Sequence, residues 1–414
     1  ACHFMTHISS NYDAYLNTLN PFCYHAKLAD NDTYTFKDML TQPDKNNFFE
    51  AMEVEITNHT ERDHWDLIPR SQLPSGSKTI MSVLSFKRKR LPDGTICKYK
   101  ARICAHGGQQ QWGVQYWETY SPVVSWMAVR TLLVLSKIHG LHTKSIDFTL
   151  VFPQADVKVP IYLHTPPGIQ LDENDLHNNT VLKLNENLYG LRDAGRTWWE
   201  HLSDGLTEMG FHSTKTDQCV FIKDDVIILI YLDDCVILSK NEDKITETME
   251  LLKKKYAITD EGNMEEYLGI KLEHSGNEIR MSQPLLIERI IDSIPGMRHA
   301  NPVNYPALPS VILTKDEHGE KRKENWHYRS LVGMLNFLTN SSHPELAYAV
   351  HQCARFCQDP KRVHEQAVKR IVQYLLSTRR NKDEYKGLLF KVDKSKSIIV
   401  YVDASFAGEW NKYW

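Results

Sequence analysis

Residues 226–239 read VIILIYLDDCVILS, two apolar runs rich in Val and Ile that flank the acids Asp233 and Asp234. Unbroken β-branched runs of this length are typical of strands buried on both faces, so the stretch predicts a β-hairpin whose turn carries both acids. Adjacent carboxylates at the tip of a buried hairpin need a cation to offset the cost of desolvation. Mg²⁺ is commonly held by one or two carboxylates together with substrate phosphates. The stretch therefore predicts a metal site for phosphoryl chemistry; the alternative is a solvated turn, since Asp is a common turn residue.

A third acid, Asp147, lies inside a predicted strand at 145–152, among the apolar residues Ile146, Phe148 and Leu150. A lone acid in such a setting is costly, and the pair at 233–234 offers it natural partners. A two-metal phosphoryl-transfer site needs carboxylates from at least two elements. The order strand, helix, strand, hairpin predicts an α+β domain in which these elements lie side by side. One metal would lower the pKa of an attacking hydroxyl, and the other would hold a triphosphate and its leaving group.

The composition is that of an ordinary globular protein of two or three domains, with 42% apolar and 24% charged residues among 414. No apolar run approaches the roughly 18 residues that span a bilayer, and residues 1–35 lack the pattern of a signal peptide. The eight cysteines are scattered without a C-x-x-C pair, which favours thiols of an intracellular protein over a disulfide framework. His351, Cys353 and Cys357 are compatible with zinc, but without a second ligand pair a helix face is the default.

Basic charge is concentrated in two segments although the net charge is −3. Residues 86–105 hold seven Lys and Arg against one acid, and residues 355–386 hold nine against four. Clustered cations are typical of phosphate-binding surfaces, and each segment taken singly also fits a solvated face.

The remaining pattern predicts an alternation of helices and strands. Predicted helices are 36–60, opened near Pro43 and Asp44, then 126–139, a helix that follows from the segment 188–199 and runs through about Met209, then 241–256, 284–294, 326–340, 343–357 and 360–377. Predicted strands are 65–69, 80–90, 96–106, 145–152, 181–186, 219–223, 267–273, 278–282, 387–392 and 397–403.

Tyr231, Leu232, Asp233 and Asp234 form a Y-x-D-D block that resembles the motif of reverse transcriptases, and its surroundings resemble copia-type retrotransposon polymerases. The matching segments, in the family's order from about residue 36 to 410, are KYKAR at 98–102, ETYSPVV at 118–124, LYGL at 188–191, YLGI at 267–270, YRSLVG at 328–333, and YVDA at 401–404 with AG at 407–408.

The resemblance implies an α+β right-hand polymerase with fingers, palm and thumb, a helical connection and a truncated RNase H-like start. The implied division is 1–35 irregular leader; 36–294 reverse transcriptase, with fingers at about 60–130 and a palm at about 131–275 that contains a fingers insertion; 295–325 linker; 326–392 helical connection; and 393–414 the RNase H-like start, which carries Asp403 but no further acid of that site.

The family's roles carry over to matching residues. Asp147 and Asp233 would bind two Mg²⁺ or Mn²⁺ ions, with Asp234 a supporting ligand in the Y-x-D-D block completed by Tyr231 and Leu232. The nucleotide-binding positions implied are Phe152 as a steric gate against a 2′-hydroxyl, Lys100 and Arg102 on the triphosphate, and Tyr189 and Gly190 beneath the nucleotide and template base. Tyr267, Leu268 and Gly269 would position the primer end, and the basic helix 360–377 would contact the duplex backbone. For Phe152, core packing is the compatible alternative.

The implied function is RNA-directed DNA synthesis from dNTPs on RNA and DNA primer–templates, without a membrane, in cytoplasmic virus-like particles or the nucleus. A homodimer or association with other polyprotein products stays open. Arg192, Asp193, Ala194 and Gly195 replace the family's Lys-Gln-Ala-Pro, and the acid at 193 could weaken nucleotide binding. Two alternatives remain: a catalytically decayed nucleic-acid-binding remnant of a retroelement, and a two-metal nuclease. RNase H activity is not expected.

Overall fold

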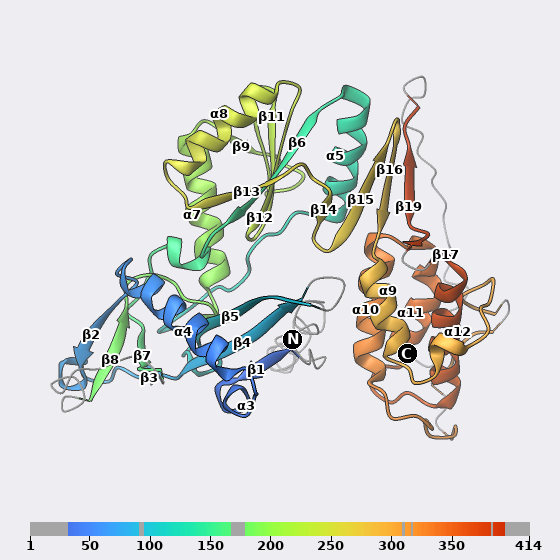
Figure 1. Cartoon of the computed structure of the whole chain (residues 1–414), viewed down its shortest axis with the longest axis horizontal. Coiled ribbons are helices and arrows are strands. Elements are labelled where there is room, and N and C mark those ends of the chain that lie inside the picture. Colours follow the sequence, from blue (N-terminus) through green and yellow to red (C-terminus); the bar gives the residue numbers. More distant parts are fainter. Residues whose placement is uncertain are drawn as a thin grey trace, which may run out of the picture.

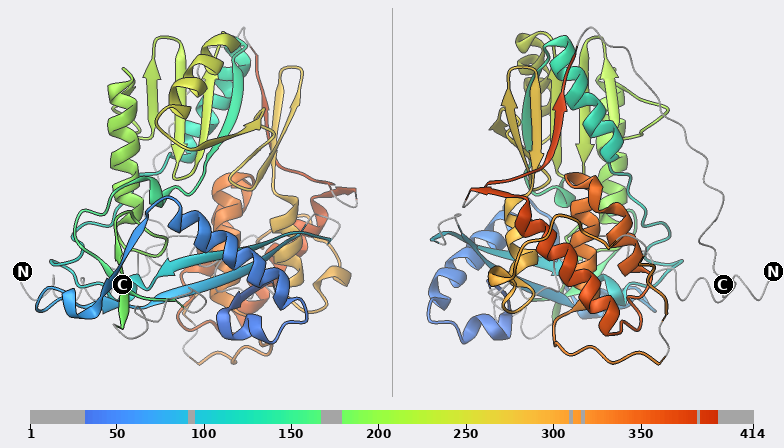
Figure 2. Two further views of the ribbon diagram at one scale, coloured as in Figure 1. Left: turned by 60° about the vertical axis from the view of Figure 1, so that its left-hand side comes forward. Right: turned by 90° about the vertical axis from the view of Figure 1, so that its right-hand side faces the viewer.

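The computed structural model describes residues 32–90, 95–166, 179–308, 311–315, 318–381 and 384–393, which form three units with separate hydrophobic cores (Figure 1). We call them the central unit, built on a six-stranded sheet; the hairpin unit, built on two smaller N-terminal sheets; and the helical unit. Figures 1 and 2 show that the hairpin and helical units both lie below the central sheet. The predicted RNase H-like start, with Asp403, and most of the predicted leader lie outside the described residues. The fold is α+β, as expected.

The central sheet is antiparallel throughout and has the strand order β13-β6-β12-β11-β10-β9. The strands are β13 (Ile258–Gly262), β6 (His142–Phe148), β12 (Asp234–Ser239), β11 (Val226–Tyr231), β10 (Val220–Lys223) and β9 (His212–Ser213). The predicted hairpin β11–β12 is confirmed, and its strands are almost wholly buried. The prediction that its turn carries both acids is wrong: the turn is Leu232-Asp233, and Asp234 pairs with Tyr231 as the first residue of β12.

The strand that carries Asp147 is shorter than predicted. It ends at Phe148, because Leu150 adopts a φ of +50°, a left-handed conformation that no strand continues through. Phe152 therefore lies in a short 3₁₀ helix, η3 (Phe152–Gln154), and not in the strand.

Three helices complete the central unit: α5 (Trp126–His139), α7 (Ala194–Glu208) and α8 (Glu242–Lys253). Each contributes an apolar face to one core with the sheet. The ends of α5 match the prediction because both caps are strong: the Ser125 side chain accepts from the Ala128 N–H, and Gly140 takes the left-handed conformation.

The hairpin unit consists of a three-stranded sheet and a four-stranded sheet. The first has the order β1 (Thr33–Thr35), β4 (Ser82–Arg90), β5 (Ile96–Ala105), and α4 (Lys45–Thr60) packs on it behind the short helix α3 (Phe36–Leu40). The second has the order β2 (Trp65–Pro69), β8 (Thr180–Leu184), β7 (Tyr162–His164), β3 (Thr79–Ile80). The predicted β4–β5 hairpin is confirmed, whereas residues 33–35, expected to be irregular, add a strand to its edge.

A smaller sheet joins the central unit to the helical unit, with the order β14 (Glu266–Tyr267), β15 (Ile270–Ser275), β16 (Glu278–Ser282), β19 (Leu388–Lys391). The single strand predicted at 267–273 is wrong, because a turn at Leu268 and Gly269 separates β14 from β15. Their φ values of +53° and +73° have the signs of a type I′ hairpin turn.

The helical unit packs α9 (Pro284–Asp292), α10 (Tyr328–Ser341), α11 (Ala347–Ala354) and α12 (Arg362–Ser377) around one core, next to the ribbon β17 (Arg379–Asn381) and β18 (Glu384–Tyr385). The helices predicted at 284–294, 326–340 and 360–377 are confirmed with small changes of boundary, whereas the helix predicted at 343–357 is limited to α11, with a 3₁₀ turn before it. Short 3₁₀ helices are η1 (Arg70–Gln72), η2 (Gly107–Gln109), η4 (Met297–His299) and η5 (Pro344–Leu346). The Arg130 guanidinium of α5 donates to the backbone oxygens of Asn340 and Ser341 at the end of α10, which ties the helical unit to the central unit.

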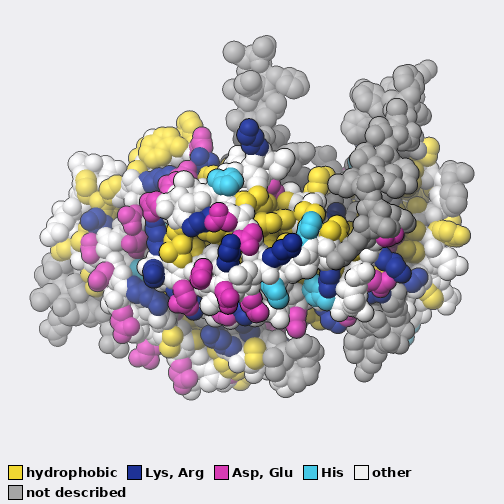
Figure 3. All heavy atoms as spheres, turned by 90° about the horizontal axis from the view of Figure 1, so that it is seen from above, with side chains coloured by type: hydrophobic (Ala, Val, Ile, Leu, Met, Phe, Trp, Pro, Cys, Tyr) yellow, Lys and Arg dark blue, Asp and Glu magenta, His cyan; other side chains and the backbone are white. Residues whose placement is uncertain are grey.

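In the described part of the chain, no helix combines the length and apolar character needed to cross a membrane. The upper surface, seen from above in Figure 3, intersperses Lys and Arg with Asp and Glu. That face is therefore of mixed charge and does not resemble a phosphate-binding surface.

Candidate active site

Three carboxylates lie at the ends of two neighbouring interior strands of the central sheet, a place that we call the acidic edge. Asp147 on β6 lies directly opposite Asp234 on β12, and Asp233 precedes it in the turn. The turn is held by two hydrogen bonds to its backbone. The Phe148 N–H donates to the backbone carbonyl oxygen of Asp233 at 3.2 Å, and the Trp198 indole N–H donates to that of Leu232 at 2.9 Å. Leu232 has a φ of +55°, a conformation that a β-branched or bulky residue rarely adopts, so these bonds hold a strained turn.

The carboxylates repel one another. Burial raises the pKa of Asp234 to about 7, and the charges of Asp233 and Asp147 add to the rise. Burial also raises the pKa of Asp147, with Asp233 and Glu261 as further causes. Raised pKa values show that the ionised forms lack compensation, which is the condition that a bound cation would relieve.

Cations of the hairpin unit face this acidic edge. Lys100 and Lys89 are the positive charges that oppose the rise of the Asp147 pKa. The pKa of Lys100 itself falls to about 8, first through burial and then through repulsion by Arg102 and Lys89. The field of the β4–β5 hairpin therefore reaches the acids.

Three of the predicted nucleotide-binding side chains contact one another beside the acids. The rings of Phe152 and Tyr189 meet edge to face with centroids 4.9 Å apart, and the Arg102 guanidinium lies 4.6 Å from the centre of the Tyr189 ring. Burial raises the pKa of Tyr189 to about 12. Phe152 packs against the cores of both the central and the hairpin units, so core packing is part of its role.

Gly190 is required by a close approach of two backbones. It has a φ of +89°, and a Cβ at this position would come within 2.2 Å of the Ala105 oxygen. The Ala105 N–H in turn donates to the Tyr189 oxygen at 2.7 Å. Because Gly190 has no side chain, the Tyr189 segment can approach the end of β5 closely enough for this bond to form. A second role of Gly190 beneath a nucleotide stays a prediction.

The predicted primer-positioning residues form the β14–β15 turn behind the acids. Tyr267 is buried, and its hydroxyl has no hydrogen-bond partner among the described residues. Together with Leu268 and Gly269 it lines a cavity of about 290 Å³ that Asp234 also lines. This turn therefore lies next to the candidate catalytic acids.

Among the described residues, no group of three or more His, Cys, Asp or Glu side chains forms a metal-ligand set. The acids therefore share one edge without closing around a central point. Their chemistry nevertheless fits a divalent cation, because oxygen ligands with uncompensated negative charge are what Mg²⁺ and Mn²⁺ prefer.

Sequence reasoning assigned no role to three residues near the acids: Trp198, Lys89 and Glu261. The Trp198 bond to the turn has no sequence signal, because Trp198 lies outside the matching segments. Residues two apart in a strand lie on the same face. The spacing of Lys87 and Lys89 in one predicted strand, and of Lys98 and Lys100 in the next, could therefore have indicated one basic face of the hairpin. Glu261 was hidden because β13, with the sequence ITDEG, lacks an apolar pattern.

Two other predicted features have structural partners. Asp193 is the N-cap residue of α7, but its side chain makes no capping hydrogen bond, and burial raises its pKa. In α12, Arg362 and Lys369 form ion pairs with Glu320 and Glu324. The exposed basic face expected of that helix is correspondingly reduced, and its contact with a duplex stays a prediction.

Comparisons with known proteins identify the family of the chain. Residues 62–309 match the family model described as reverse transcriptase (RNA-dependent DNA polymerase). The chain is 30% identical over 92% of its length to a retrovirus-related Pol polyprotein from transposon TNT 1-94 of Nicotiana tabacum, and 30% identical over 87% to that from transposon RE1 of Arabidopsis thaliana. It is 24% identical over 88% to the transposon Ty1-DR6 Gag-Pol polyprotein of Saccharomyces cerevisiae.

The chain spans 28%, 24% and 21% of these three relatives, respectively. Among solved structures, a foamy viral protease–reverse transcriptase in complex with double-stranded DNA is similar with a TM-score of 0.38 and 12% identity, over 78% of this chain and 47% of that chain. The match over residues 62–309 covers more than half of the chain and includes the whole acidic edge. The chain therefore belongs to the reverse transcriptase (RNA-dependent DNA polymerase) family, in the form found in copia-type retrotransposon Pol polyproteins.

Proposed function

We propose that this chain extends a primer by nucleotidyl transfer, copying an RNA or DNA template with dNTPs. The primer 3′-hydroxyl attacks the α-phosphate of the dNTP, a new phosphodiester bond forms, and pyrophosphate leaves. The observation that carries the proposal is the pairing of Asp147 with Asp234, next to Asp233, on an edge faced by the cations of the β4–β5 hairpin.

In this reading the central unit is the palm, the hairpin unit the fingers, and the helical unit a thumb with its connection. The boundaries predicted at residues 294 and 325 fall within or beside the helical unit, where α9 shares its core with α10, α11 and α12. One unit built from these four helices is the simplest division that a shared core supports.

Asp147, Asp233 and Asp234 would hold two Mg²⁺ or Mn²⁺ ions. When bound, such ions lower the pKa of an attacking hydroxyl and neutralise the charge that develops on the leaving group. The protein's own contribution is positional: the bonds from Phe148 and Trp198 fix the turn, so Asp233 stays beside the other acids.

Lys100 and Arg102 would bind the triphosphate. Their side chains leave the same face of β5 two residues apart, and no ion pair with a carboxylate engages either one among the described residues. Arg102 also holds the ring of Tyr189, which in turn contacts Phe152. Tyr189 and Phe152 would thus position the sugar and base of the nucleotide, while Lys100 and Arg102 bind its phosphates.

The rival role as a decayed remnant keeps its support at Asp193. This residue, which departs from the family's pattern, is the N-cap residue of α7, but its side chain makes no capping hydrogen bond and burial raises its pKa. The pairing of Asp147 with Asp234 next to Asp233 argues against the remnant. The nuclease alternative has no observation in its favour, because the acids found together are those of the Y-x-D-D hairpin and Asp147.

The test is extension of a labelled primer on an RNA template with dNTPs and Mg²⁺, beside an Asp233→Asn variant. We expect extension by the wild-type chain and its loss in the variant, with equal binding of primer–template by both. A chain that binds primer–template and extends nothing would establish the remnant, and one that shortens the primer would establish the nuclease.

A further inference from the structure

A well-anchored loop exposes three large aromatic side chains beside the candidate active site. We call residues 110–124, which join the hairpin unit to the central unit, the aromatic loop. Trp112, Trp117 and Tyr120 are exposed to 70%, 53% and 72% of their full surfaces. Exposed aromatic side chains of this size in a cluster mark a binding surface more often than a chance arrangement.

The loop is held in place along its whole length. Its own backbone is tied by the bond from the Gly113 N–H to the Tyr116 oxygen at 2.9 Å, and the Trp112 indole donates to the Trp117 oxygen at 3.1 Å. At the far end, the Arg196 guanidinium donates to the Tyr120 oxygen at 3.2 Å. The aromatic side chains therefore project from a fixed backbone, which lowers the entropy cost of binding through them.

Both ends of the loop are fastened to the candidate active site. At its start, the Gln110 side chain accepts from the Arg192 N–H at 2.7 Å, two residues after Gly190. At its end, the Val124 N–H donates to the oxygen of Ile230, next to Tyr231 of the catalytic hairpin. A ligand bound along the loop would therefore lie next to the candidate active site.

Arginine and amide side chains flank the aromatic loop. Its single acid, Glu118, forms an ion pair with Arg196 at 3.2 Å, and Arg196 also pairs with Glu200 at 2.9 Å. The Arg192 guanidinium lies 5.3 Å from the centre of the Tyr116 ring, on the same side as Gln110. Aromatic faces flanked by arginines and amides are a surface on which unpaired bases stack independently of sequence.

We infer that the aromatic loop binds the single-stranded part of the template ahead of the site of synthesis, by stacking its bases on Trp112, Trp117 and Tyr120. The inference rests on the proposed function, since a template must be unpaired on one side of the acids where it is copied. The ligand class is single-stranded RNA or DNA, and the recognition is by base faces.

The test compares two primer–templates with the same duplex and different 5′ template overhangs, about 2 and about 12 nucleotides long. The full chain is compared with its Trp117→Ala and Tyr120→Ala variants, whose altered side chains make no hydrogen bond to any other described residue. Tyr305→Ala is the matched control for Tyr120→Ala. Tyr305 is also an exposed tyrosine, at 66%, and it lies outside the aromatic loop, between η4 and α10.

We expect each loop variant to raise the KM for the long overhang about fivefold, the effect of one lost stacked base, and to leave kcat and the short-overhang KM unchanged. Tyr120→Phe restores the ring and is expected to restore the KM, and Tyr305→Ala should behave as wild type. Equal effects on both substrates, or none on either, would overturn the inference.

A direct measurement separates this inference from the proposed function. Titration of the full chain with an unprimed homopolymer of deoxythymidylate or uridylate should quench tryptophan fluorescence, and Trp117→Ala should weaken that binding by a similar factor. Failure of all primer extension with this binding intact would defeat the polymerase alone. Sedimentation that shows a wild-type dimer abolished by Trp117→Ala would instead assign the loop to a second copy of the chain and defeat the inference.

Discussion

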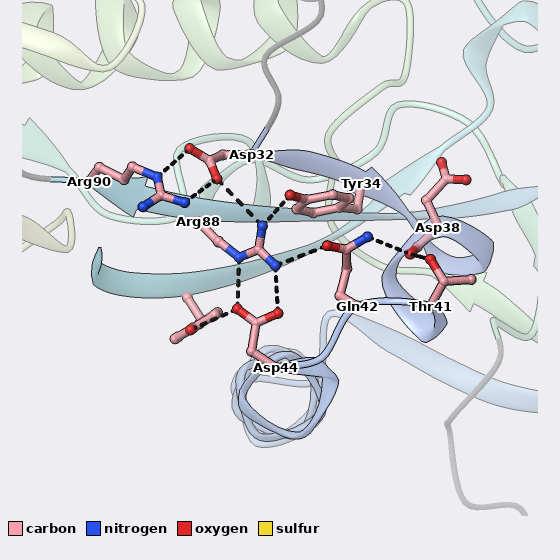
Figure 4. A network of polar contacts seen from close by, with 9 residues as sticks. Asp32, Tyr34, Asp38, Thr41, Gln42, Asp44, Arg88 and Arg90 are labelled. Atoms are coloured by element: carbon pink, nitrogen blue, oxygen red, sulfur yellow. Dashed lines mark hydrogen bonds and ion pairs between the residues drawn. The ribbon is translucent and has the colours of Figure 1, made fainter. Parts of the chain in front are cut away.

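The two faces of the β4–β5 hairpin carry the same kind of side chain for opposite purposes. On the face that meets α4, Arg88 forms a bidentate pair with Asp44, at 2.7 and 2.5 Å, and Arg90 pairs with Asp32 (Figure 4). On the other face, Lys89 stands directly opposite Lys98, and Lys87 opposite Lys100. Like charges opposite one another destabilise a strand pair.

The difference shows that the basic segment 86–105 contains two populations of cations. The pKa of Asp44 falls to about 2, mainly through its hydrogen bonds with Arg88, so this pair stabilises the fold. The pKa of Lys100 falls to about 8, first through burial and then through repulsion by Arg102 and Lys89, and its charge acts on Asp147. Perturbed pKa values on two facing elements mark this region as a candidate functional site.

The largest effect is expected at the acidic edge. Asp234→Asn should lower the rate of nucleotide incorporation by about a thousandfold or more, because a carboxylate that serves the metals is lost. The same change should stabilise the metal-free protein at pH 8 by about 2 kcal/mol, because it removes a repelled buried charge. Incorporation assays and urea unfolding in a chelator would measure the two effects.

The pH dependence of that stabilisation has a definite sign. The folded-state pKa of Asp234, about 7, lies above its ordinary value of 3.8, so the native state binds the proton more tightly than the unfolded state. Wild-type stability should therefore fall as the pH rises from about 4 to 7, relative to Asp234→Asn, and the two chains should converge near pH 4. A constant difference across this range would show that Asp234 is not a repelled acid.

The next effect sharpens the contrast between the two faces. Arg88→Met should lower the free energy of unfolding by about 3 kcal/mol, because it leaves the Asp44 carboxylate without its bidentate partner. Lys98→Met, on the other face, should change it by about 0.5 kcal/mol or less, or should raise it through relief of the opposition to Lys89. Chemical denaturation measures both, and equal losses would show that the two faces do not differ.

A smaller effect tests the contact that positions Tyr189. Gly190→Ala should destabilise by about 2 kcal/mol, because a Cβ would collide with the Ala105 oxygen in a left-handed conformation. Gly269→Ala is the control: its φ of +73° carries the same conformational cost of about 1 kcal/mol, but nothing lies within 4 Å of its Cβ position. A loss at Gly190 no larger than that at Gly269 would place the Tyr189 segment away from β5.

Elements with strong local signals were predictable from the sequence. The continuous apolar runs of β11 and β12 and the caps of α5 fix those elements without reference to distant residues. Positions set by distant partners were not predictable. The short β6 depends on the left-handed Leu150, and the β14–β15 turn on the left-handed Leu268, a residue type with no preference for such turns.

The candidate site shows the same division. The three acids were predictable, because charge inside apolar strands is costly and must have a reason. The sequence could not predict that Arg88 and Arg90 have carboxylate partners whereas Lys89 and Lys100 lie on the other face. Those partners, Asp32 and Asp44, are far away in the chain. The pairing of the polar strand β13 beside Asp147, which brings Glu261 to the site, had no local signal either.

The central claim is that uncompensated cations of the hairpin unit serve the nucleotide while the compensated ones serve the fold. The most direct test measures kcat/KM for a single dNTP and the thermal midpoint in Lys100→Met and Arg88→Met, at a temperature where both variants are folded.

We predict that Lys100→Met lowers kcat/KM about a hundredfold at an unchanged midpoint, and that Arg88→Met lowers the midpoint at a nearly unchanged kcat/KM. Parallel losses of both quantities in both variants would contradict the account.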